Sequence, residues 1–140
     1  MDGLRARSQT LSPGSFRMIH FDTNFLIQTV VAGSAAHEKF RAWTAAAEIC
    51  NASSIAWAEF LCGPLDASAT AIAQQIFPRP EPFLPADAVL SAQLFNQTGR
   101  RSRSLADCMI AAVAIRCGAK LATINTADFQ SFVSHGLVLA

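Results

Sequence analysis

The chain has 140 residues, of which 51% are hydrophobic and 15% are charged, and its formal net charge is +1. This balance is typical of a globular chain with one hydrophobic core and excludes a disordered polypeptide. No apolar stretch reaches the ~18 residues of a membrane-spanning helix. The four cysteines form no CxxC pair, which argues against zinc and predicts buried free thiols in a reducing cytoplasm.

Residues 1–17 show neither helical nor strand periodicity, so we expect an unstructured lead followed by one folded domain over residues 18–140. Arginines in this lead precede an apolar stretch, as in a signal peptide, but Asp22 interrupts that stretch and excludes a signal peptide. Because Met18 opens the first predicted strand, it is also a candidate for the natural start of the protein.

The first predicted strand, residues 18–21, leads directly into Asp22, Thr23 and Asn24. A short apolar run that ends in polar residues is typical of a buried parallel strand followed directly by a helix. In open α/β sheets, ligands bind at this end of the strands. Asp22 is therefore a candidate site residue, although an Asp here is equally consistent with a helix N-cap.

Helical and strand patterns alternate along the rest of the chain. We expect helices at 24–31, 35–47, 55–62, 67–76, 86–97 and 105–117, a short helix near 128, and strands at 49–53, 120–124 and 137–139. Four prolines between positions 78 and 85 predict a loop with an edge strand around Phe83. This order predicts a three-layer α/β fold with a parallel central sheet flanked by helices.

Three later acids lie near other strand-to-helix junctions. Asp107 could complete a capping box with Ser104, and Asp128 could stabilise the first turn of a helix. Glu59 is flanked by aromatic residues, where a carboxylate would be buried and metal-bound or paired, or else lie on a solvated face.

Taken together, the four acids predict a metal site more strongly than any one of them. A parallel sheet would gather Asp22, Glu59, Asp107 and Asp128 at one edge. Two carboxylates ~4 Å apart repel by about 4 kcal/mol at an effective dielectric constant near 20, so a shared pocket favours a cation. Oxygen ligands select Mg²⁺ or Mn²⁺, and such ions support hydrolysis of phosphodiesters.

Two further sets of polar residues accompany these acids. The neutral set could orient an acid, a water or a phosphate, or simply cap turns, and it consists of Thr23, Asn24, Thr123 and Asn125. The basic set could bind RNA phosphates or form a solvated loop, and it consists of Arg100, Arg101 and Arg103.

From Met18 onward the chain resembles PIN-domain ribonucleases, most closely the toxin halves of VapBC toxin–antitoxin pairs. Four segments carry the resemblance in the right order: IHFDTNFLI (19–27), IAWAEFLCG (55–63), SLADCMIAAVA (104–114) and GAKLATINTADF (118–129). The resemblance implies a PIN fold and Mg²⁺- or Mn²⁺-dependent endoribonuclease activity on structured RNA such as tRNA or rRNA. It also implies a homodimer and a cognate VapB-type antitoxin that covers the site formed by the four acids.

The resemblance assigns roles to the four acids. Asp22 and Asp107 correspond to the first and third acids of the family, which are its best-defined metal ligands. Glu59 corresponds to the second acid and Asp128 to the fourth, whose position varies more within the family. Asn125 lies where the family usually has Asn. Residues 66–96 match the family only in the arrangement of their predicted elements and not in sequence. The resemblance therefore assigns them no contact with RNA or antitoxin.

Two alternatives to a nuclease stay open. One is a non-catalytic PIN-fold module that binds RNA or protein. The other is a phosphohydrolase with Asp22 as nucleophile, although that chemistry generally has a second Asp where this chain has Asn24.

Overall fold

Four parallel strands form one sheet at the centre of the molecule. The computed structural model describes residues 17–63, 66–99 and 104–140. Within them the strands follow the order β2-β1-β3-β4, with bounds β1 Met18–Phe21, β2 Ile49–Asn51, β3 Lys120–Ala122 and β4 Val138–Leu139. In the central strand, Ile19 lies opposite Cys50 of β2, and His20 lies opposite Leu121 of β3.

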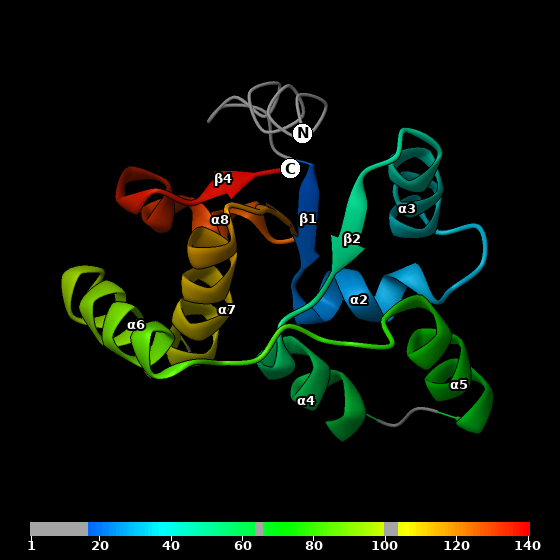
Figure 1. Ribbon diagram of the computed structural model, residues 1–140, viewed down its shortest axis with the longest axis horizontal. Coiled ribbons are helices and arrows are strands. Elements are labelled where there is room, and N and C mark those ends of the chain that lie inside the picture. Colours follow the sequence, from blue (N-terminus) through cyan, green and yellow to red (C-terminus); the bar gives the residue numbers. More distant parts are fainter. Residues whose placement is uncertain (1–16, 64–65, 100–103) are drawn as a thin grey trace, which may run out of the picture.

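Helices cover both faces of this sheet. They are α2 Thr23–Thr29, α3 Ala35–Ala45, α4 Ser54–Cys62, α5 Ala67–Ile76, α6 Pro85–Gln97, α7 Ser104–Cys117, α8 Thr126–Phe129 and the 3₁₀ helix η1 Gln130–His135. Helix α3 packs against β2 and α7 against β3, while α6 packs on the outer side of α7 (Figure 1). The predicted three-layer α/β fold with a parallel sheet is confirmed.

An aromatic layer fills one face of the sheet. Phe21 of β1 is fully buried, and its ring centroid lies 4.8 Å from that of Phe25 in α2 and 5.3 Å from that of Phe77. The rings of Phe40 and Trp43 from α3 also pack on Phe21. Because side chains alternate along a strand, this face belongs to Phe21 and the opposite face to His20. The aromatic contacts hold α2 and α3 against the end of β1, where the candidate site begins.

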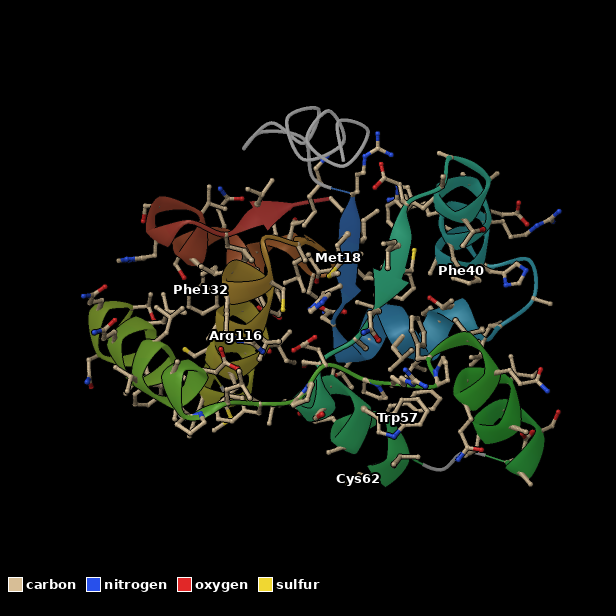
Figure 2. All side chains as sticks on the ribbon, in the orientation of Figure 1. Met18, Phe40, Trp57, Cys62, Arg116 and Phe132 are labelled. Carbon is tan, nitrogen blue, oxygen red and sulfur yellow. The ribbon has the colours of Figure 1, made fainter. Side chains whose placement is uncertain are left out.

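A polar network on the opposite face joins α6 to α7. Arg116, which projects from α7 in Figure 2, donates through Nε to Asp87 Oδ1 at 2.7 Å and through Nη2 to Glu81 Oε2 at 3.1 Å. Asp87 is 1% exposed, and its second oxygen accepts from the Leu84 N–H at 2.8 Å. Nothing in the sequence analysis pointed to this network.

Some elements begin or end at other residues than predicted. Helix α2 ends at Thr29, and β3 ends at Ala122 rather than at 124. The strand stops because the Thr123 hydroxyl accepts a hydrogen bond from the Asn125 N–H at 3.0 Å, which turns the chain toward α8. This turn brings Thr123 and Asn125 to the same edge of the sheet as Asp22.

Two further predictions need correction. Helix α7 is described from Ser104, one residue before the predicted start at Leu105. The edge strand expected around Phe83 is present as a single parallel bridge between Ser53 and Glu81, two residues earlier. The prolines on either side of Glu81 limit it to that one bridge, because proline has no N–H to donate.

The cysteines are only partly as predicted. All four are free, but Cys108 alone is buried and Cys62 is exposed, since it lies in the last turn of α4 at the surface. Along the described part of the chain, no helix is both long and apolar enough to cross a bilayer.

Candidate metal and nucleic-acid site

Asp22 lies where the central strand meets the first helix. Its N–H donates to the Ala122 carbonyl of β3 at 3.1 Å, so the residue is still tied to the sheet. Its Oδ1 atom accepts from the Phe25 N–H at 2.8 Å, which confirms the N-cap interpretation. The residue is only 4% exposed. A carboxylate is therefore fixed and nearly buried at the carboxyl edge of the parallel sheet.

The surroundings of Asp22 disfavour its negative charge. Burial raises the pKa of the Asp22 carboxyl, hydrogen bonds from Thr123 and from the Phe25 N–H oppose that rise, and the charges of Asp128 and Glu59 raise the pKa further. The hydrogen bonds thus only partly offset the cost of the ionised form. A cation at this position would favour the carboxylate and remove that cost.

Glu59 is joined to this region by a hydrogen bond between two helices. The Thr23 hydroxyl of α2 donates to Glu59 Oε1 of α4 at 2.5 Å, and α2 packs against α4. Glu59 is exposed, so of the two alternatives left open by the sequence the structure shows the solvated face. Helix α4 buries Ala56 and Phe60 and turns Glu59 outward, and Trp57, labelled in Figure 2, is half-buried.

The turn after β3 supplies the remaining members of the site. Asp128 is exposed in the first turn of α8, and its N–H donates to the Asn125 carbonyl at 3.0 Å. The Thr123 hydroxyl accepts from the Asn125 N–H and donates to the Asp22 carboxylate, so it fixes both the turn and the acid. We refer to Asp22, Thr23, Glu59, Thr123 and Asp128 as the Asp22 cluster.

The other predicted site residues lie on α2, on α7 and in the segment before α7. Asp107 is half-buried in the first turn of α7, and the packing of α7 against α4 links it to the same side of the molecule. Asn24 is exposed on α2. Arg100, Arg101 and Arg103 lie outside the described residues, so their predicted contact with RNA stays a prediction.

The Asp22 cluster fits a hydrated metal ion better than a closed cage. Considering residues 17–63, 66–99 and 104–140, no three His, Cys, Asp or Glu side chains converge closely enough to hold one ion. Mg²⁺, however, usually keeps several waters and is bound by only one or two carboxylates. Asp22 with one neighbouring acid would therefore be sufficient, and the exposed side chains of Glu59 and Asp128 have freedom to approach.

A cavity of about 580 Å³ lies beside the cluster. It opens between α2, α3 and the turn after β3, and its lining includes Phe25, Lys39, Thr123 and Ile124. Thr123 belongs both to this lining and to the Asp22 cluster, so cavity and cluster adjoin. The sequence does not reveal this cavity, because its lining comes from segments far apart in the chain that meet only in the folded molecule.

The sequence matches the PIN domain family over residues 19–132. The chain is a PIN domain protein. PIN domains are generally nucleases. Among proteins with a curated description, none matches the sequence.

Three solved structures are similar to this PIN domain. VapBC2 from Rickettsia felis, bound to a DNA fragment from their promoter, has 19% identity and a TM-score of 0.68, covering 88% of this chain and 97% of that one. DNA-bound VapBC from Salmonella typhimurium has 20% identity and a TM-score of 0.68, with coverage of 90% and 98%. FitAcB from Neisseria gonorrhoeae has 24% identity and a TM-score of 0.64, with coverage of 88% and 97%. At these identities the likeness shows a shared fold.

Proposed function

We propose that this PIN domain protein is a Mg²⁺- or Mn²⁺-dependent endoribonuclease that hydrolyses phosphodiester bonds in RNA. The observation that carries the proposal is the buried carboxylate of Asp22, whose pKa is raised by burial and further by two neighbouring acids. Negative charge that the protein itself does not offset is typical of a cation site. Its position at the carboxyl edge of a parallel sheet is where substrates reach such folds.

The proposal assigns a role to each acid. Asp22 and Asp107 are the principal metal ligands, and Glu59 and Asp128 complete the acidic pocket. When bound, the metal would activate a water and stabilise the leaving oxygen of the phosphodiester. Within the chain, Thr123 and the Phe25 N–H hold the Asp22 carboxylate in one orientation.

Neutral and basic residues support this arrangement. The hydrogen bond from Thr23 orients Glu59 toward α2. Asn24 and Asn125, both exposed beside the cluster, are proposed to orient water or phosphate. Arg100, Arg101 and Arg103 are proposed to bind RNA phosphates near the metal, because guanidinium groups match phosphate oxygens in geometry.

We further propose that the protein is the toxin component of a type II toxin–antitoxin pair. Its similarity in fold to VapBC and FitAcB complexes supports a VapB-type antitoxin as partner. The proposed assembly of the toxin itself is a homodimer. The proposed place of action is the cytoplasm, on tRNA or rRNA. Co-expression with the neighbouring reading frame, followed by measurement of the mass of the complex, tests the partner and the assembly together.

Cleavage of total bacterial RNA tests the nuclease itself. The purified protein is assayed with Mg²⁺ or Mn²⁺ and with EDTA, beside Asp22→Asn and the control Asp66→Asn. Asp66 is a matched control because its Oδ1 also caps a helix, accepting from the Ala69 N–H at 2.7 Å, but it is exposed at the start of α5.

We expect discrete fragments that require metal, persist in Asp66→Asn and are lost in Asp22→Asn. Undiminished cleavage by a folded Asp22→Asn variant would contradict the proposal. Metal binding by the parent protein without cleavage of any RNA would favour the non-catalytic binding module instead.

A further inference from the structure

We propose that the cavity beside the Asp22 cluster binds one nucleotide of the RNA strand, adjacent to the phosphate that is cut. This inference rests on the proposed function for the identity of the strand, but binding in the cavity is measurable without cleavage. The volume of about 580 Å³ lies within the range of about 300–1,000 Å³ typical of small-molecule sites. The shared residue Thr123 makes the cavity the neighbour of the proposed metal position.

One part of the cavity wall suits the faces of a base. Ile124 contributes an apolar side chain that is 52% exposed. Phe25 also lines the cavity, but it is only 3% exposed because its ring packs on Phe21 and Trp43. Half of the Ile124 side chain therefore leaves apolar surface in contact with water. Contact with the flat apolar face of a nucleobase would cover it.

The polar part of the wall suits the edges of a nucleotide. Gln28 and Thr126 are exposed, and neither side chain has a hydrogen-bond partner among the residues that the structure describes. An amide and a hydroxyl each offer both a donor and an acceptor. They can therefore pair with the edge of a base or with the ribose 2′-hydroxyl, the group that distinguishes RNA from DNA.

Lys39 supplies a cation at the same cavity. It projects from α3, and within the described ranges no carboxylate comes within ion-pair distance of it. The nearest acid in sequence, Glu38, instead pairs with Arg41 at 3.9 Å. An unpaired ammonium group is suited to an RNA phosphate, and here it would offset the repulsion between RNA and the acids of the Asp22 cluster.

Nuclear magnetic resonance provides a test that is independent of cleavage. Adenosine and cytidine 5′-monophosphates are titrated to millimolar concentration into the ¹⁵N-labelled, metal-free protein. We expect amide shifts at Ala35, Ala36 and Thr126, which line the cavity. Ala35→Phe should abolish these shifts by filling the cavity, whereas Ala42→Phe, at a position that is also exposed and lies further along α3, should leave them intact. Absence of shifts, or equal shifts in both variants, would overturn the inference.

Steady-state kinetics of RNA cleavage then tests whether the nucleotide bound in the cavity is part of the substrate strand. Lys39→Ala should raise KM about fivefold, the effect of one lost phosphate contact, and leave kcat unchanged. It should also lower the slope of log affinity against log salt by about 0.7, the value for one phosphate of a single strand. Arg41→Ala removes the same charge from the same helix and should change neither quantity. An unchanged KM and slope in Lys39→Ala would contradict binding of the strand, even if free nucleotides bind.

The two proposals fail in different ways. If no RNA is cleaved but nucleotides shift the cavity amides, the proposed nuclease fails and the nucleotide site stands. If RNA is cleaved but the cavity amides do not respond, the nuclease stands and the nucleotide site fails.

Discussion

At the scale of single residues, the N-cap role of Asp22 and its proposed role as a metal ligand make different electrostatic demands. As an N-cap it needs only an oxygen that accepts from the Phe25 N–H, whereas as a metal ligand it needs a full negative charge. Its raised pKa shows that the ionised form costs stability at pH values above that pKa, and that this cost disappears on protonation.

This conflict predicts different effects for two substitutions in metal-free protein at pH 7. Asp22→Asn keeps the capping oxygen and removes the charge, so the melting temperature should rise. Asp22→Ala loses the cap as well and should lower the free energy of unfolding by about 1 kcal/mol relative to Asn. Thermal denaturation in EDTA measures both, and a loss of stability in Asp22→Asn equal to that in Asp22→Ala would contradict this account of the charge.

His20 gives the fold an acid-sensitive position. It is 1% exposed, and neither ring nitrogen has a hydrogen-bond partner within the described structure. Burial lowers the pKa of His20 to about 4, with Glu81 opposing and Arg116 adding to that effect. The unfolded chain takes up the proton near pH 6.5, while the folded protein resists it until about pH 4.

The free energy of unfolding should therefore fall by up to about 3 kcal/mol as the pH drops from 6.5 to 4. Urea denaturation across this window measures the fall. In His20→Leu most of the decline should disappear, whereas His135→Leu, which changes an exposed histidine, should behave as the parent. If the free energy of unfolding of His20→Leu fell with pH as it does in the parent, other titrating groups and not His20 would cause the fall.

At the scale of elements, the connection between α6 and α7 depends on one buried charge. Asp87 is almost fully buried, whereas Arg116 and Glu81 each have side chains that are 27% exposed. Removing Arg116 leaves a buried carboxylate without its cation, and breaking a buried pair costs roughly 3–5 kcal/mol. The partial exposure of Arg116 reduces this cost, because water can enter.

We therefore expect Arg116→Met to destabilise the protein by about 2–3 kcal/mol and Glu81→Gln by less than about 1 kcal/mol. The double variant Arg116→Met/Asp87→Leu should recover much of the loss, since no charge is then left buried. Chemical denaturation of the three variants measures these changes in the free energy of unfolding. A loss of stability in Glu81→Gln as large as that in Arg116→Met would contradict the view that the loss comes from the unpaired buried charge of Asp87.

At the scale of the whole molecule, the order and type of the elements could be predicted from the sequence. Alternating apolar segments and capping residues predicted the strands and helices, and the polar residues after β1 and β3 pointed to the sheet edge where the candidate site lies. Boundaries shifted where side chains intervened, as when Thr123 ended β3 two residues early.

What could not be predicted depends on contacts between distant segments. Glu59 is exposed because the packing of Phe60 sets the rotation of α4, which no local pattern reveals. The pairing of Arg116 with Asp87 and the cavity beside Lys39 each join residues far apart in the chain. Such features exist only after the layers have packed.

The central claim is that the acids around Asp22 bind a divalent cation, and a Mn²⁺ titration followed by thermal denaturation tests it most directly. A ligand that binds only the folded state stabilises it by about 2.7 kcal/mol when its concentration is 100 times the dissociation constant. We expect Mn²⁺ to raise the melting temperature of the parent protein and of Asp66→Asn, and to leave Asp22→Asn unchanged. An equal rise in Asp22→Asn, or no rise in the parent protein at millimolar Mn²⁺, would contradict the claim.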